Sequence, residues 1–191
     1  MPSTTAKWST PLPVQMVSVL MSACTAPVSY THLTLSAKNQ SFAAGSFGTG
    51  PTASSAFTMN GVEVGGSYSV NGFGFVANFQ QGNGLGLLSD GDQGNVRNTH
   101  SFVQGTYQLT AKDKIGLSWG RSENGSRPTA GVLLSGTTAD VKSNTNTTVG
   151  LYHSLTPAIT LVGEIGNTTS QSFAGTNAKQ DSVAAGAIFF F

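Results

Sequence analysis

The chain ends with DSVAAGAIFFF at residues 181–191, and this stretch decides how the rest of the sequence is interpreted. Counting back by twos from the last residue gives one apolar row, formed by Phe191, Phe189, Ala187, Ala185 and Val183. Successive side chains of a β-strand point to opposite faces, so this period of two predicts a strand with one apolar face. A strand that completes a soluble β-sandwich would show the same row. A strand of a transmembrane β-barrel would show it too. The other segments must distinguish between a barrel and a soluble sandwich.

A second pair of alternating segments flanks Asn71-Gly72, which is a strong short signal for a β-hairpin turn. Before the turn, one face carries Val62, Val64, Gly66, Tyr68 and Val70. After the turn, the same face carries Phe73, Phe75, Ala77 and Phe79. Mostly polar or small residues alternate with both rows, so the pattern predicts an antiparallel hairpin with one apolar and one polar side.

The same alternation predicts further strands at residues 103–110, 114–120, 149–153 and 159–165, with one more around Ser41–Phe47. Short turns are expected at residues 71–72, 111–113 and 156–157, and long polar loops at residues 82–98, 122–146 and 167–180. Short turns at one end and long loops at the other are typical of transmembrane barrels with periplasmic turns and extracellular loops. The sequence therefore predicts an all-β fold, an antiparallel transmembrane β-barrel present here as a partial wall of about seven to eight strands.

Composition agrees with this fold and argues against several other classes. The 191 residues include 24 Gly and only 9% charged residues, the net charge is +1, and the mean hydropathy is −0.01. No window holds 18 consecutive apolar residues, as a membrane-spanning helix would require, whereas a barrel strand needs only about 9 to 11 alternating residues. The few Lys and Arg residues form no basic stripe, which argues against nucleic-acid binding. The single cysteine, Cys24, cannot form a disulfide within the chain.

Residues that could carry chemistry are few and poorly arranged. None of the three histidines, His32, His100 and His153, has a carboxylate at a spacing typical of a catalytic group, so no enzyme activity is expected. The glycine-rich run at residues 82–86 lacks the helix and the lysine of a phosphate loop. The segment at residues 90–95 could offer oxygen ligands to Ca²⁺, but it lacks the distal glutamate of the helix-loop-helix site. No metal or cofactor is therefore expected.

The rows opposite the apolar ones are candidates for lining a water-filled lumen. They place seven polar or charged residues on that side: Glu63, Asn78, Gln80, Gln104, Gln108, Lys114 and Glu164. In a wet channel such residues set size and charge preference through their field and perform no chemistry. Two glutamates against one lysine predict a mild preference for cations.

Two internal stretches, DKIGLSWG at residues 113–120 and YHSLTPAITLVGEIG at residues 152–166, together with the closing strand, resemble the general Gram-negative porin family over about residues 57–191. In that family sixteen strands close a trimeric channel for ions and small hydrophilic solutes, and the third extracellular loop folds inward. The resemblance implies a bacterial outer-membrane location, contact with outer-membrane lipid and passive diffusion as the function. This chain would be the C-terminal half of a protein that is a homotrimer when full length, and the constricting loop would lie in the other half.

The closing strand resembles the part of outer-membrane barrels that the barrel-assembly machinery recognises, with Phe189 and Phe191 as the signal. One departure is that Ile188 and Phe190 occupy lumen-facing positions where porins often carry charged residues. Two alternatives stay open. One is a complete small eight-stranded outer-membrane barrel with a structural or adhesive role, which the glycine-rich inward rows disfavour because they leave little bulk to fill a closed interior. The other is an outer-membrane enzyme, which the missing catalytic group disfavours.

The first 35 residues do not follow the alternating pattern. An apolar stretch from Val14 to Ala23 could belong to a degenerate secretion signal. The run VSYTHLTL at residues 28–35 resembles a translated adapter used in preparing sequencing libraries. The predicted organisation is therefore an N-terminal segment of doubtful origin at residues 1–35 and a porin-like β-barrel fragment at residues 36–191.

Overall fold

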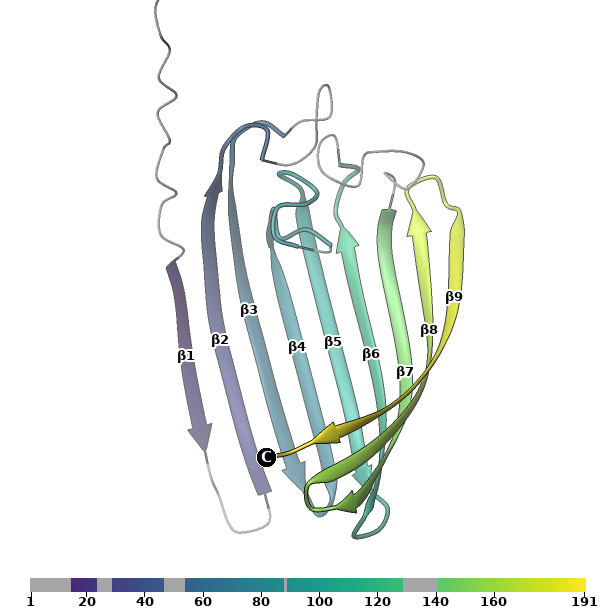
Figure 1. Cartoon of the computed structure of the whole chain (residues 1–191). Coiled ribbons are helices and arrows are strands. Elements are labelled where there is room, and N and C mark those ends of the chain that lie inside the picture. Colours follow the sequence, from purple (N-terminus) through teal and green to yellow (C-terminus); the bar gives the residue numbers. More distant parts are fainter. Residues whose placement is uncertain (1–14, 24–28, 47–53, 88, 129–140) are drawn as a thin grey trace, which may run out of the picture.

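The computed structural model describes residues 15–23, 29–46, 54–87, 89–128 and 141–191, and these form one antiparallel sheet of nine strands (Figure 1). The strands are β1 (Gln15–Ala23), β2 (Ser29–Phe42), β3 (Phe57–Val70), β4 (Phe73–Asn83), β5 (Arg97–Gln108), β6 (Asp113–Asn124), β7 (Val141–Thr156), β8 (Ile159–Ser172) and β9 (Asn177–Phe189). Each strand pairs with its neighbours in sequence, so the order in the sheet is the order in the chain. The predicted all-β antiparallel fold is confirmed.

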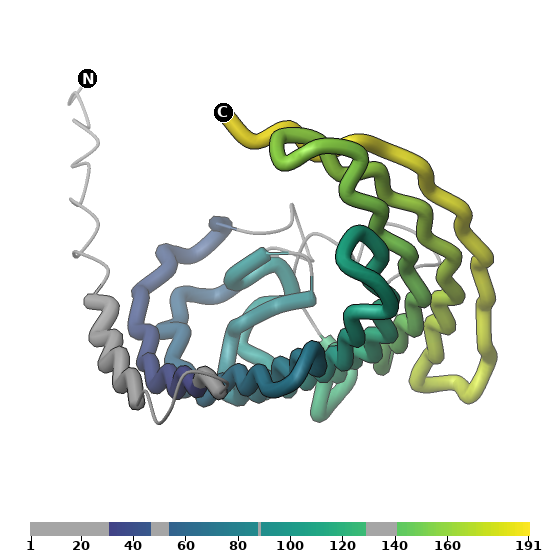
Figure 2. The backbone as a smooth tube through the Cα atoms, turned by 90° about the horizontal axis from the view of Figure 1, so that it is seen from below, coloured from purple at the N-terminus to yellow at the C-terminus, as the bar shows by residue number. Residues whose placement is uncertain are grey.

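The sheet bends into an arc without closing (Figure 2). Strands β1 and β9 are its two edges, and in the described part of the chain they do not pair with each other. Such an open, curved sheet is the shape of part of a barrel wall. It does not match the alternative of a complete eight-stranded barrel.

Turn chemistry explains one end of the sheet. Asn71 has a φ of 48° and Gly72 a φ of 81°, the two positive values that a type I′ hairpin turn requires. The other short connections at this end are residues 109–112 and 157–158. The short-turn end therefore follows the predicted positions closely.

The opposite end holds the longer connections, at residues 43–56, 84–96 and 125–140, with one exception. The predicted loop at residues 167–180 is wrong, because β8 continues to Ser172 and β9 begins at Asn177, leaving only residues 173–176. Polar cross-strand bonds sustain this extension, since Asn167 Nδ2 donates to Asp181 Oδ1 at 2.7 Å. The Ser172 hydroxyl then accepts the backbone N–H of Thr176 at 3.1 Å and so closes the turn.

The N-terminal part of the sheet differs from the prediction. The strand expected around Ser41–Phe47 lies mostly upstream, because β2 ends at Phe42. β2 runs across the predicted boundary between residues 35 and 36, with Leu35 opposite Val64 and Ser36 opposite Glu63. β1 occupies most of the apolar stretch at residues 14–23, and the secretion signal considered there stays a prediction. The proposed origin of residues 28–35 stays a prediction, and residues 1–14 and 24–28 lie outside the described part.

One face of the sheet, here called the convex face, is apolar and exposed. Cross-strand partners line up in rows on it: Leu35, Val64 and Phe79 across β2 to β4, and Leu117, Val149, Ile165 and Val183 across β6 to β9. All of these side chains are exposed, and Val183 is 83% exposed. A continuous exposed apolar surface of this extent indicates contact with an apolar environment. Among the described residues, no helix is long and apolar enough to cross a membrane.

Candidate functional site

The other face, here called the concave face, carries the predicted lumen-lining residues. The register places Glu63 opposite Gln80 and Gln108 opposite Lys114, and directly paired residues point to the same side. The same alternation places Asn78, Gln104 and Glu164 on this side. All seven predicted residues therefore share one face of the sheet. Whether that face lines a lumen stays a prediction.

The connection at residues 84–96 folds back over the concave face, inside the arc (Figure 2). Leu85 contacts this face at Gly61, where an added Cβ would lie 2.7 Å from Leu85 Cδ2. Met59, which is 1% exposed, Leu85 and Val96 are the buried apolar side chains of the described residues. The small apolar core thus lies between the sheet and this loop. The sequence predicts a constricting loop in the other half of a longer protein, and that stays a prediction. The loop at residues 84–96 is an inward fold that the sequence analysis did not predict.

Two buried asparagines hold the loop to the sheet. Asn98 is 0% exposed, its Nδ2 donates to Asn124 Oδ1 at 2.6 Å, and its Oδ1 accepts the backbone N–H of Gly86 at 3.0 Å. Asn124 Nδ2 in turn donates to the Val141 carbonyl at 2.9 Å, and Gln93 Oε1 lies 3.4 Å from the same nitrogen. Buried amides that satisfy each other in this way fix a single arrangement. We call Asn98 and Asn124 the amide latch.

Sequence reasoning missed the amide latch because both residues stand at the ends of polar stretches, where asparagine is common. The only available signal was that Asn98 and Asn124 follow the alternation of β5 and β6 on the concave face. Their burial depends on the loop folding back over them, which no local pattern predicts.

The loop carboxylates that were considered for Ca²⁺ have other partners. Asp92 Oδ1 accepts the backbone N–H of Leu87 at 2.9 Å, and Asp92 Oδ2 lies 3.3 Å from the Ser89 nitrogen. Asp90 lies 3.9 Å from the Lys38 ammonium. The described residues contain no group of three or more His, Cys, Asp or Glu that could hold a metal ion. Asp92 therefore acts as an internal cap of the loop.

The charged groups of the concave face are also partnered. Glu63 accepts hydrogen bonds from Asn78 Nδ2 at 2.6 Å and from the Ser36 hydroxyl at 3.2 Å. The Tyr152 hydroxyl donates to Glu164 Oε1 at 2.8 Å, and the Lys114 ammonium lies 5.1 Å from the centre of the Tyr152 ring. These contacts fix the charges in place over β2 to β4 and over β6 to β8.

His100 and His153 lie at opposite ends of the sheet, His100 at the start of β5 and His153 near the end of β7. His100 Nδ1 is 2.9 Å from the Ser122 hydroxyl, and His100 also hydrogen-bonds the backbone of Gly86. His153 Nδ1 is 2.7 Å from Asp113 Oδ1 at the short-turn end. His100 thus joins the loop to the sheet, next to the amide latch.

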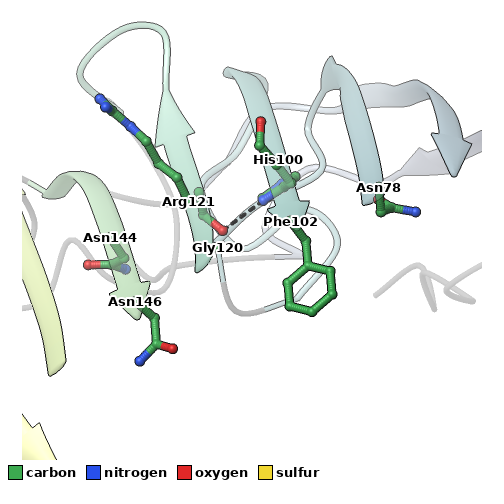
Figure 3. A pocket seen from close by; sticks show the side chains of 9 residues that line it. Asn78, His100, Phe102, Gly120, Arg121, Asn144 and Asn146 are labelled. Atoms are coloured by element: carbon green, nitrogen blue, oxygen red, sulfur yellow. Dashed lines mark hydrogen bonds between the residues drawn. The ribbon is translucent and has the colours of Figure 1, made fainter. Parts of the chain in front are cut away.

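A pocket of about 350 Å³ lies on the sheet around Phe102 and Gly120 (Figure 3). Its lining comes from β4 to β7 and consists of Asn78, His100, Ser101, Phe102, Gly120, Arg121, Ser122, Asn144 and Asn146. In Figure 3 the Phe102 ring and the Asn146 amide extend on either side of Gly120. The pocket combines one aromatic ring with several amide and hydroxyl groups.

No protein-family profile matches the chain, and no curated protein matches it. Among solved structures, the chain is similar to the outer membrane channel DcaP of Acinetobacter baumannii, with a TM-score of 0.66 and 16% sequence identity. The alignment covers 94% of this chain and 52% of that chain, so the chain spans about half the length of this structural neighbour. At this identity the similarity shows the fold, which is that of a partial outer-membrane β-barrel.

Proposed function

We propose that the chain forms part of the wall of an outer-membrane channel, through which ions and small hydrophilic solutes diffuse passively. The single observation that carries this proposal is the division of the sheet into an exposed apolar convex face and a polar concave face. A barrel with lipid outside and water inside requires this division along every strand. The fold similarity to an outer-membrane channel supports it.

In this proposal the inward-folded loop narrows the passage, and the fixed charges of the concave face set its preference. Lys38 lies opposite Gly61 on this face, a residue that the sequence-based set did not include. On the concave face of the strands, the positive charges of Lys38 and Lys114 balance the negative charges of Glu63 and Glu164. The loop residue Asp90 adds a negative charge beside Lys38. A mild cation preference therefore depends on the loop more than on the strand rows.

The end of β9 has features that support a role in barrel assembly. Phe189 pairs with Ile159 on the convex face and is 63% exposed, and the Phe190 N–H donates to the Ala158 carbonyl at 2.9 Å. We infer that Phe189 and Phe191 serve as the signal for the barrel-assembly machinery. Homotrimer formation by a full-length protein is part of the same proposal. Ile188 lies on the concave face opposite Thr160, so the passage beside β9 is less polar than elsewhere.

The test is swelling of liposomes that contain the chain at increasing protein density, in isotonic solutions of uncharged solutes of graded size. Edges β1 and β9 expose backbone groups that hydrocarbon cannot satisfy, so a pore needs at least a second copy to pair with them. We therefore expect swelling to rise more steeply than linearly with density and to fall with solute size. Insertion shown by protease protection, without size-dependent swelling at any density, would contradict the proposal.

A further inference from the structure

The pocket on the concave face lies along one transverse row of the sheet. Asn78 is opposite Phe102, Phe102 is opposite Gly120, and Gly120 is opposite Asn146. Four neighbouring strands thus contribute one residue each at the same height. The row therefore runs from an amide to an aromatic ring, a glycine and a second amide. The glycine leaves a gap between the Phe102 ring and the Asn146 amide.

Gly120 creates this gap. A Cβ at position 120 would lie 3.6 Å from Phe102 Cδ2 and 3.7 Å from the Ser101 carbonyl oxygen, which are ordinary contact distances. The backbone therefore tolerates a side chain here, and any branched side chain would occupy the space beside the ring. The absence of a side chain at Gly120 leaves one side of the Phe102 ring free.

Phe102 is unusual for its surroundings. It is a large apolar side chain, 37% exposed, in a pocket whose other side chains are amides, hydroxyls, a histidine and the guanidinium of Arg121. Exposure of an aromatic ring to water is unfavourable unless something covers it. A ring face also carries the negative side of its quadrupole, which attracts the slightly positive hydrogens of C–H groups.

Apart from Arg121, the polar groups around the ring are amides, hydroxyls and a histidine, and Asn146 is held in place by its neighbours. Asn146 Nδ2 donates to the Thr168 hydroxyl at 2.8 Å, and Asn146 Oδ1 accepts from the Thr148 hydroxyl at 2.9 Å. An amide has two donors and two lone pairs, so Asn146 keeps one of each for a ligand. Arg121 also lines the pocket; its Nη2 lies 3.1 Å from Glu123 Oε2, which offsets its charge, while its buried Nε has no hydrogen-bond partner. The pocket therefore favours an uncharged ligand.

We propose that this pocket is a binding subsite for a neutral, hydroxylated ring such as one hexose unit. The C–H face of the ring stacks on Phe102, and its hydroxyls exchange hydrogen bonds with Asn146, Asn144 and Ser122. The volume of about 350 Å³ lies at the small end of the range of about 300 to 1,000 Å³ that is usual for ligand pockets, which suits one ring with a few waters. The proposal rests on the channel function, since it supplies a stopping point for a solute that crosses the concave face.

The test is saturation-transfer NMR on the whole chain in lauryldimethylamine oxide micelles, with methyl glucoside as the probe. A sugar-based detergent would compete for the pocket and is avoided. We expect saturation of the sugar C–H protons, and no saturation of glycerol, which has hydroxyls but no ring. Phe102→Ala is expected to weaken methyl glucoside binding about three- to tenfold, and Phe102→Tyr to keep it.

Gly120→Val is expected to abolish the signal by filling the gap. Matched controls on the same face are Val76→Ala, which also removes an exposed apolar side chain, and Gly186→Val, where an added Cβ meets nothing within 4 Å. The proposal is overturned if Phe102→Ala and Gly120→Val keep the wild-type signal while far-UV circular dichroism shows the β-sheet intact, or if the controls lose it equally. If the protein binds methyl glucoside but gives no liposome swelling, the proposed channel function is contradicted and the proposed sugar subsite is retained.

Discussion

Replacing Leu117 by Arg is expected to destabilise the membrane-inserted protein by about 2 to 4 kcal/mol. Leu117 lies in the middle of β6 on the convex face, is 54% exposed, and stands between Gly105 and Val149 in the cross-strand row. A guanidinium at this depth has no water to hydrate it and must distort the lipid or the strand. Urea unfolding in lipid vesicles, followed by tryptophan fluorescence, measures the change.

The matched control for Leu117→Arg is Ser118→Arg, one residue further on the opposite face. A charge there enters the concave side, so the free energy of unfolding should change little, while the ion selectivity should shift toward anions. Equal destabilisation by the two substitutions would show that the assignment of faces is wrong.

Replacing Asn98 by Leu is expected to cost about 2 to 6 kcal/mol and to release the loop at residues 84–96 from the concave face. The change leaves the Gly86 N–H and Asn124 Oδ1 buried without their partner, and each orphaned group costs about 1 to 3 kcal/mol. Faster cleavage of the loop by proteinase K, together with faster hydrogen exchange of the Gly86 amide, would report the release. Liposome swelling by larger solutes should increase in the same variant.

Asn167→Leu is the control for the amide latch, because Asn167 is also a strand asparagine near the longer-loop end but makes an exposed bond to Asp181. Its effect should stay within about 0.5 kcal/mol. Loop protection that survives Asn98→Leu unchanged would mean that the small apolar core around Met59 and Leu85 holds the loop by itself.

The period-two pattern was sufficient to predict the sheet from β3 onward. Alternation fixes which side chains share a face, and Asn71-Gly72 fixes the register of the first predicted hairpin, so all seven lumen candidates fall on one face. The pattern failed to predict strand ends where β8 and β9 continue beyond their apolar residues. At residues 167–180 polar side chains such as Asn167 and Asp181 bond across the strands, and a backbone ladder does not require apolar residues.

The parts of the site that depend on distant contacts could not be predicted. The loop at residues 84–96 is polar and rich in glycine, and nothing in its own sequence indicates that it folds onto the sheet. Its position is determined by Asn98, by Asn124 on the next strand and by the contact of Leu85 with Gly61. The pocket likewise exists because Gly120 is paired with Phe102. This pairing depends on the register of β5 and β6, which the local sequence of either strand does not reveal.

The central claim is that the concave face meets water while the convex face meets lipid, and two adjacent residues of β5 test it directly. Gln104 lies on the concave face opposite Ser118, and Val103 lies on the convex face opposite Trp119. Each is replaced by Cys in a Cys24→Ser background, and the rate of reaction with a charged methanethiosulfonate reagent is measured in lipid vesicles. Only the thiolate reacts, and an apolar environment raises the pKa of the thiol by one unit or more, so Gln104→Cys should react at least about tenfold faster. Equal rates, or a faster reaction of Val103→Cys, would contradict the account.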